Sequence, residues 1–247
     1  SGDYIGGVAC NAKIYALKVE NSSGIIYSDK VIAAWDWCVS HKNDDPANPI
    51  LVINNSLGSG VYTSYCDGDN TAYANAASAA AAAGITICAS SGNDGYCNKI
   101  ISPACLTNTI SVGAVYDASL GTYRPCVSPM SCVSKTADYD CESGYSATDV
   151  SYADKVTSYS NTASFLDILA PATSAYTTDI AGSYGYSSGS YVSFGGTSAA
   201  AAYACGAIAC LQSAAKEIIG VYLTPAQVRQ ILVTSGDMIA DAKAAIA

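Results

Sequence analysis

Short apolar segments alternate with helix-patterned segments along much of the chain. Runs of apolar, β-prone residues predict strands at residues 14–19, 50–54, 85–89 and 109–115. Apolar positions at helical spacing predict a helix that begins at Ser28, its candidate N-cap, and residues 71–83 predict a second helix that Gly84 closes. Strands that alternate with helices indicate βαβ units and a mostly parallel sheet.

The alternation stops at residues 116–159, a stretch rich in Ser, Tyr and Asp that holds Cys126, Cys132 and Cys141. These features predict a long, cysteine-rich insertion braced by disulfides, within a single domain over residues 1–247. Residues 162–170 return to a strand-like pattern, and the Gly/Ser/Tyr-rich residues 182–190 predict a hairpin or loop.

Two helices are predicted near the C-terminus. Residues 198–213 are small and apolar nearly all round, which is typical of a buried helix. The sequence Thr224-Pro225-Ala226-Gln227 forms a capping box with proline at the first helical position. A helix of about ten residues should follow and end near Gly236.

The composition narrows the possible partners. The 247 residues carry a formal net charge of -9, and 50% of them are hydrophobic, which suits one large α/β domain. The acidic balance argues against nucleic acid and anionic membrane surfaces as partners. No apolar run reaches the roughly 18 residues that a membrane-spanning helix needs, so no membrane partner is expected.

The 11 cysteines divide into two sets. Six lie in Gly/Asp/Asn/Ser/Pro-rich stretches, which indicates disulfides and a secreted protein, although free thiols in a reducing compartment would fit the same pattern. These six are Cys66, Cys97, Cys105, Cys126, Cys132 and Cys141. The other five lie among small or apolar residues and predict free thiols that pack as small hydrophobes. Without a C-x-x-C pair, and with His41 as the only histidine, no metal site is expected.

The segment Gly195-Gly196-Thr197-Ser198 precedes the small-residue helix. A serine there has its hydroxyl at a helix N-terminus, where the helix dipole and free backbone N–H groups favour developing negative charge. Taken alone, Ser198 could equally be a simple helix N-cap.

Two other segments place polar residues just after buried strands. Residues 89–95 carry Asn93 on a turn, from which its amide can point into a cleft, or which an asparagine occupies for conformational reasons alone. Residues 51–58 run from a buried strand into Ser56, Leu57 and Gly58, which could also be a plain strand end.

Taken together and in this order, these segments resemble the subtilase (subtilisin-like, S8-type) family of serine proteases. The family pattern runs from a strand ending in Asn-x-Ser-Leu-Gly, through a strand ending in Gly-Asn, to Gly-Thr-Ser on a helix. Residues 7–19, 110–115 and 165–171 match as well, so the resemblance covers the chain except about residues 116–155. It implies a three-layer α/β/α fold that lacks its N-terminal strands, and a serine endopeptidase acting on proteins or peptides through an acyl-enzyme.

The resemblance also implies roles for particular residues. Ser198 corresponds to the nucleophile, and Asn93 to the side chain that binds the tetrahedral oxyanion. Ser56, Leu57 and Gly58 correspond to the edge segment that pairs with an extended substrate. One wall of the pocket for the residue before the scissile bond corresponds to Ala89, Ser90, Ser91 and Gly92. This wall is small and uncharged, so a bulky apolar side chain is expected there.

The family's triad Asp and His lie in Asp-Ser/Thr-Gly and His-Gly-Thr-His motifs, and neither motif occurs in this chain. His41 belongs to a helix end that the family places away from the cleft, so we expect it to be an ordinary surface residue. Asp167 resembles a structural position. The expected partner is therefore an N-terminal Asp/His segment, without which the fragment should be inactive. Its absence should also leave a gap about one strand wide between residues 14–19 and 50–54.

Three functions stay open. The first is an endopeptidase that is active with its N-terminal segment. The second is a non-catalytic relative that binds peptides or serves as a structural surface protein. The third is an unrelated parallel α/β domain. The resemblance requires no cofactor, although calcium is a candidate ligand of the acidic loops at residues 67–69 and 138–142. Ala202 and Tyr203 replace the family's usual Pro and His after the serine, and that His is not the catalytic base.

Overall fold

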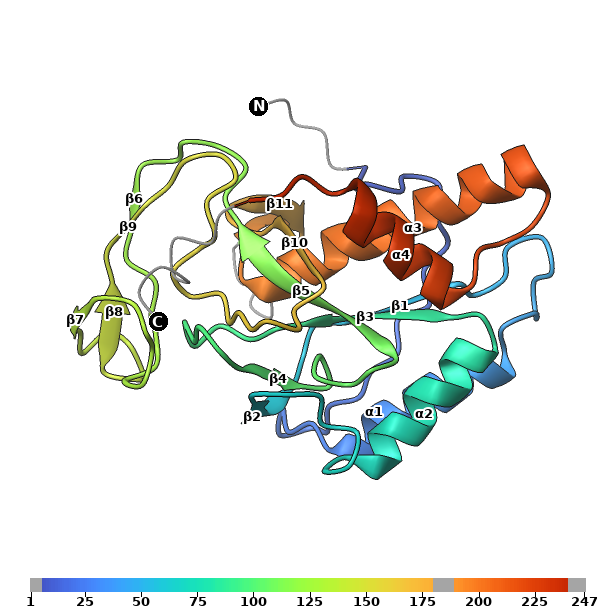
Figure 1. Cartoon of the computed structure of the whole chain (residues 1–247), viewed down its shortest axis with the longest axis horizontal. Helices are drawn as coiled ribbons and strands as arrows, with labels where there is room; N and C mark the ends of the chain where they lie inside the picture. The colour runs from blue at the N-terminus through green and yellow to red at the C-terminus, as the bar shows by residue number, and fades with distance from the viewer. Residues whose placement is uncertain (1–5, 180–188, 240–247) are drawn as a thin grey trace.

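The computed structural model describes residues 6–179 and 189–239 (Figure 1). Its centre is a four-stranded sheet in the order β1-β3-β5-β10, in which all three pairings are parallel. These strands are Val52–Asn55, Thr86–Ser90, Thr109–Val115 and Ile168–Pro171. Every residue of β3 and β5 is buried, as expected for parallel strands covered on both faces.

Helices cover both faces of this sheet. α1 (Ser28–Ser40) and α2 (Thr71–Ala82) lie below it in Figure 1, whereas α3 (Thr197–Ile219) and α4 (Pro225–Ser235) lie above it. Each face has its own apolar core. Trp35, Ile53 and Ile87 belong to the lower core, and Val112, Ile208 and Val228 belong to the upper one. The three-layer α/β/α architecture predicted from the sequence is confirmed.

Four pairs of short antiparallel strands surround the main sheet. The first pair is β2 (Ser59–Tyr62) with β4 (Ile100–Ser102). The pair β11 (Ala175–Thr178) and β12 (Tyr191–Phe194) flanks residues 182–190, and the hairpin or loop predicted there lies almost wholly outside the described residues. The other two pairs lie in the insertion, namely β6 (Thr122–Tyr123) with β9 (Asp149–Val150) and β7 (Lys135–Ala137) with β8 (Tyr145–Ala147).

The six loop cysteines form three disulfides, as the sequence predicted. Cys97–Cys132 ties the insertion to the loop after β3, and Cys126–Cys141 closes the insertion on itself. Cys66–Cys105 joins the segment before α2 to the segment after β4. The other five cysteines are free, but Cys10 and Cys210 are exposed and therefore do not pack as core hydrophobes.

Several local predictions fail because neighbouring elements decide them. Residues 14–19 form no strand, and Ile14 is 88% exposed, because no described segment pairs with them. The described residues likewise leave the outer edge of β1 unpaired. Ser28 is the first residue of α1, whose N-cap is Tyr27 without a side-chain hydrogen bond. The strand predicted at 162–170 is shortened to β10.

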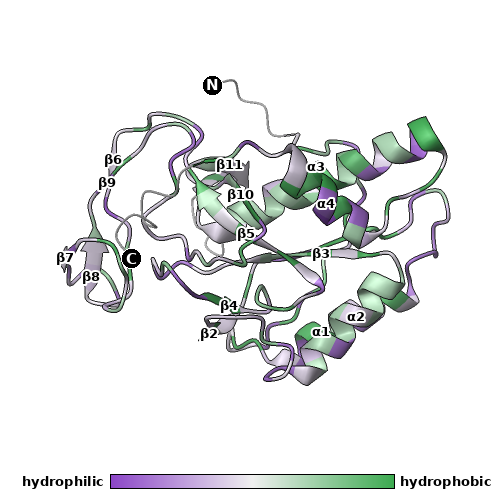
Figure 2. Ribbon diagram, in the orientation of Figure 1, coloured by the Kyte–Doolittle hydropathy of each residue, from purple (hydrophilic) through white to green (hydrophobic). Residues whose placement is uncertain are grey.

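Helix α3 is longer and less buried than predicted. It spans 23 residues, and both Ile218 and Ile219 near its end are exposed, in the apolar tip visible in Figure 2. By length and composition alone it could cross a membrane, with a mean hydropathy of 1.3, which corrects the expectation that no apolar run is long enough. Its N-terminal half instead packs against the sheet through alanines, namely Ala200, Ala201 and Ala204.

The capping box of α4 forms as predicted. The backbone N–H of Gln227 donates to the Thr224 hydroxyl, and the backbone N–H of Thr224 donates to the Gln227 side chain. Arg229 on this helix forms an ion pair with Asp167, 3.2 Å apart. Asp167 also accepts a hydrogen bond from the backbone N–H of Ser111 on β5. Asp167 thus joins α4 to the sheet, in keeping with the structural position that it resembles.

Asp149 fixes the base of the insertion. It is 3% exposed and accepts hydrogen bonds from the Tyr116 hydroxyl (2.8 Å) and the Ser158 backbone N–H (2.7 Å), beside the Lys155 ammonium. Burial pushes the pKa of Asp149 upward, but Lys155 and these hydrogen bonds outweigh it and hold the pKa below its ordinary value. The ionised carboxylate therefore stabilises the fold.

We expect Asp149→Asn to destabilise the protein by about 3 kcal/mol at pH 7, because it removes one partner of a buried ion pair. A lowered folded-state pKa contributes stability above the unfolded-state pKa, and that stability is lost as the pH falls through the folded value. The difference between wild type and variant should therefore shrink below about pH 4. Urea unfolding between pH 3 and 7 measures it, and a constant difference over that range would contradict the assignment.

Candidate active site

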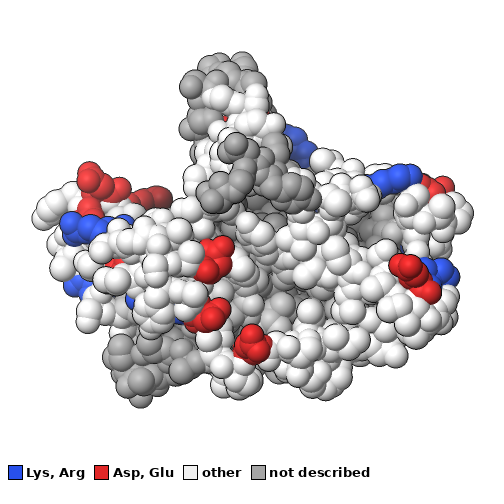
Figure 3. Space-filling view, turned by 90° about the horizontal axis from the view of Figure 1, so that it is seen from above, with Lys and Arg blue, Asp and Glu red and all other residues white. Residues whose placement is uncertain are grey.

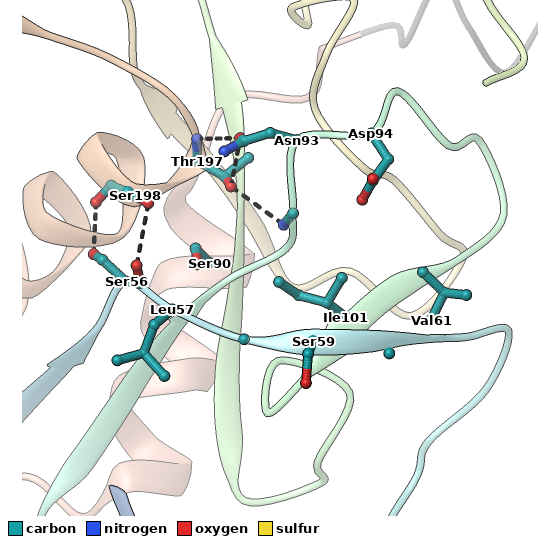
Figure 4. Close-up of a pocket in the computed structure, with 13 residues that line it drawn as sticks. Ser56, Leu57, Ser59, Val61, Ser90, Asn93, Asp94, Ile101, Thr197 and Ser198 are labelled. Atoms are coloured by element: carbon teal, nitrogen blue, oxygen red, sulfur yellow. Dashed lines mark hydrogen bonds between the residues drawn. The ribbon is translucent and has the colours of Figure 1, made fainter. Parts of the chain in front are cut away.

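A cleft opens at the carboxyl ends of β1 and β3, the edge at which parallel α/β sheets commonly bind ligands (Figure 4). Three segments far apart in the sequence line it. Residues 56–61 come from the connection of β1 to β2 and from β2 itself, residues 90 and 92–94 from the end of β3 and the loop after it, and residues 197–198 from the start of α3. Ile101 of β4 completes the lining.

Ser198 lies in the first turn of α3. The N-cap Gly196 has a φ of +88°, a conformation that glycine adopts without strain and that turns the chain sharply into the helix. The Ser198 hydroxyl donates to the Ser56 carbonyl oxygen (3.2 Å), and the Ser56 hydroxyl donates to the Ser198 carbonyl oxygen (2.8 Å). This reciprocal pair fixes the helix start against the end of β1.

The Asn93 side chain points toward the same helix start (Figure 4). Its Oδ1 accepts from the Thr197 backbone N–H (2.8 Å) and from the Thr197 hydroxyl (2.9 Å). The Thr197 hydroxyl in turn accepts from the Gly92 backbone N–H (3.2 Å). With Oδ1 held in this way, the Nδ2 group of Asn93 is the part of the amide that can donate to a ligand.

Asn161 holds the Asn93 loop from behind. It is fully buried, and its Oδ1 accepts from the backbone N–H groups of Asp94 (3.0 Å) and Tyr96 (3.1 Å). Its Nδ2 donates to the Asp94 carboxylate (2.9 Å). Sequence reasoning did not identify Asn161, because it lies 67 residues from Asp94 and no local motif marks it.

The structure brings most of the predicted site residues to the cleft. Ser56, Leu57, Gly58, Ser90, Gly92, Asn93 and Ser198 all line it. Ala89 and Ser91 are fully buried and do not line it. Ala89 belongs to the lower core, and the Ser91 hydroxyl donates to the Asn161 carbonyl oxygen (2.8 Å). Successive residues of an extended backbone point to opposite sides, which explains why Ser90 and Gly92, but not Ala89 and Ser91, reach the cleft. The lining also includes Asp94 and Ile101, which the sequence did not single out.

His41 does not belong to this cleft. It is the residue at which α1 ends, and its ring stacks on Trp37 with centroids 4.2 Å apart. Its Nδ1 lies 2.9 Å from the Trp37 carbonyl oxygen. Since His41 is the only histidine in the sequence, no imidazole of this chain stands beside Ser198.

Within residues 6–179 and 189–239, no cluster of three or more His, Cys, Asp or Glu side chains could hold a metal ion. The Asp67 carboxylate accepts hydrogen bonds from Thr107, and Asp138 accepts one from the Asp140 backbone N–H. Calcium binding at these two loops stays a prediction. The face of the molecule in Figure 3 carries only scattered charged side chains.

The chain is therefore an α/β protein with a parallel sheet, and its cleft lies at the carboxyl ends of the strands beside a serine in the first turn of α3. A model of the subtilase family matches residues 1–244, so the chain belongs to the subtilase family of serine proteases. It is 31% identical over 83% of its length to a subtilisin of Bacillus sp. strain TA39, of which it covers 41%. It is also 30% identical over 92% of its length to an extracellular protease of Xanthomonas campestris pv. campestris, of which it covers 32%.

Solved structures support the fold. A cold adapted subtilisin-like serine proteinase superposes with a TM-score of 0.62 at 23% identity, covering 95% of this chain and 65% of that protein. A lanthipeptide protease gives a TM-score of 0.63 at 22% identity, covering 95% of this chain and 66% of that protein. The chain thus spans 41% or less of these two sequence relatives and about two thirds of each structural neighbour.

Proposed function

We propose that this chain carries the nucleophile and the oxyanion site of a serine endopeptidase. The observation that carries the proposal is the convergence of Ser198 and Asn93 on one cleft, from the start of α3 and the loop after β3. Ser198 attacks the scissile carbonyl carbon, the peptide C–N bond breaks as the amine leaves with a proton, and water then hydrolyses the acyl-enzyme that remains. The Asn93 amide and the Ser198 backbone N–H stabilise the oxyanion of each tetrahedral intermediate.

The proton of Ser198 needs an acceptor, and among the described residues its hydroxyl donates to the Ser56 carbonyl oxygen, which is too weakly basic to take the proton. We therefore infer that the general base and its orienting carboxylate come from a segment outside residues 1–247. The unpaired outer edge of β1 supports this inference, because it offers backbone groups to an added strand. The exposed apolar residues Ile14, Tyr15 and Leu17 offer a surface for the same segment.

The three disulfides and the relatives named as extracellular proteases favour secretion. An extended peptide fits residues 56–58 by backbone pairing, since this segment forms one lip of the cleft. The substrate class that follows is an unfolded protein or peptide.

A second function is peptide binding without catalysis. It is favoured by the position of His41, the only histidine of the sequence, which lies at the end of α1 and not in the cleft. The two functions are separated by incubating the full-length protein with denatured casein and identifying new N-termini by mass spectrometry. Endopeptidase activity predicts new N-termini that a fluorophosphonate abolishes. Casein retained without new N-termini would contradict the endopeptidase and support the binding protein.

A further inference from the structure

The cleft is divided by one apolar side chain. From the proposed endopeptidase function, we propose further that Ile101 restricts the substrate residue just before the scissile bond to a small side chain. Glycine, alanine and serine are the residues that this site would accept. The inference rests on contacts that Ile101 makes with both walls of the cleft.

The two walls are glycine backbones. Gly58 lies on the wall contributed by the β1–β2 connection, and Gly92 lies on the wall contributed by the loop after β3. A Cβ atom added to Gly58 would lie 2.8 Å from Cδ1 of Ile101. A Cβ atom added to Gly92 would lie 2.9 Å from Cγ2 of Ile101. The Ile101 side chain therefore packs with one branch against each wall, and it fills the space between Gly58 and Gly92.

The position of Ile101 follows from its strand. Successive side chains of a strand point to opposite faces, and β4 obeys this rule. Ile100 is fully buried in the lower core, so Ile101 faces the cleft. Figure 4 shows the Ile101 side chain between β4 and the loop that carries Asn93.

The strand is also held on both sides. Ser102 pairs with Ser59 of β2, and the Ile101 backbone N–H donates to the Ser91 carbonyl oxygen (3.1 Å). Because isoleucine is branched at Cβ, its side chain has few alternative rotamers. The Ile101 backbone cannot shift without breaking one of these contacts, and its side chain has few other positions to adopt, so a large substrate side chain meets an obstacle.

This result changes the specificity expected from the sequence. The small wall at Ser90 and Gly92 suggested room for a bulky apolar side chain, but that expectation considered the wall alone. Ile101, which comes from β4 and packs on both walls, occupies the room that the small wall leaves. A substrate side chain larger than a methyl or hydroxymethyl group would have to displace Ile101.

The test uses the full-length protein and peptide p-nitroanilides that differ only in the residue before the scissile bond, namely Ala, Leu, Phe or Lys. We expect kcat/KM for Ala to exceed that for Phe by about 100-fold in the wild type. In the series Ile101→Val, Ile101→Ala and Ile101→Gly, the Phe/Ala ratio should rise stepwise with the volume removed. In the remote control Ile218→Ala, an exposed position late in α3, the ratio should stay at the wild-type value.

The inference would be overturned if the wild type cleaved the Phe or Lys substrate as well as the Ala substrate, or if the Phe/Ala ratio of kcat/KM did not change along the Ile101 series. Either result would leave the proposed endopeptidase function standing. Thermal melting identifies any variant that fails to fold, and the Ile101→Val and Ile101→Ala variants then carry the test. If the wild type cleaves no substrate, the proposed function fails by itself. Calorimetric binding of peptides that end in Ala or Phe still tests Ile101, since a preference for Phe would overturn the inference.

Discussion

The Ser198→Ala variant of the full-length protein loses peptide hydrolysis by about 10⁶-fold, the loss established for the nucleophilic serine of subtilisin. Alanine keeps the small volume at the start of α3, so the fold is preserved while the attacking oxygen is removed. The variant should melt within a few degrees of the wild type. Initial rates on a peptide p-nitroanilide, together with melting curves, measure both effects.

Ser56→Ala is the matched control for this prediction. Ser56 and Ser198 exchange hydrogen bonds, but the Ser198 hydroxyl donates to the backbone carbonyl of Ser56, which alanine retains. Loss of the Ser56 hydroxyl removes only one anchor of the helix start, so kcat should fall by less than about tenfold, the worth of roughly one hydrogen bond. A Ser198→Ala protein as active as Ser56→Ala would exclude Ser198 as the nucleophile.

Asn93→Ala lowers kcat by about 10²–10³-fold with little change in KM, which is the magnitude established for the corresponding asparagine of subtilisin. The interaction is made with the transition state, so the ground-state affinity for substrate should not change. Steady-state kinetics on one good peptide substrate separate kcat from KM. A raised KM with an unchanged kcat would instead make Asn93 a substrate-binding residue.

Asn93→Asp separates oxyanion binding from a structural role. Aspartate keeps an oxygen that can accept from the Thr197 backbone N–H and hydroxyl, so the start of α3 remains held. It lacks the Nδ2 donor and adds a negative charge where the oxyanion forms. We therefore expect Asn93→Asp to lose at least as much kcat as Asn93→Ala while melting like the wild type. Activity retained in Asn93→Asp would show that Asn93 acts only through the helix start.

Local sequence patterns predicted the elements whose signal lies within one short segment. The β5 bounds at residues 109–115 were correct, because a continuous apolar run is typical of a strand buried on both faces. The Thr224–Gln227 capping box formed because its two partners lie three residues apart. The strand expected at 14–19 did not form, since a strand needs a paired neighbour and none of the described segments supplies one. Propensity alone cannot provide that neighbour.

The site was predictable in its motifs but not in its supporting contacts. Ser198 and Asn93 stand in recognisable segments, and the structure brings both to one cleft. Asn161 holds the Asn93 loop from behind through its buried amide, and Ile101 lines the cleft from β4; no spacing in the sequence marks either residue. Ala89 and Ser91 were assigned to the cleft as part of a continuous wall, although the alternation of an extended chain turns them into the interior.

The placement of the site at the end of β1 connects the fold to the proposed chemistry. Ser56 directly follows β1, and β1 is also the edge strand whose outer side pairs with no other described strand. A segment that supplies a strand there would bring its own side chains to the Ser198 side of the cleft. Completion of the sheet and completion of the active site would then be one event.

Covalent labelling of the folded full-length protein by a fluorophosphonate tests this account most directly. The serine oxygen attacks the phosphorus atom of the reagent, fluoride leaves and the hydroxyl proton passes to the base, so the adduct reports a serine that a base has activated. The account predicts one adduct, on the peptide that contains Ser198, and its loss in Ser198→Ala. Folded full-length protein that remains unlabelled, or that is labelled at another residue, would contradict the claim that Ser198 is the nucleophile of a complete protease.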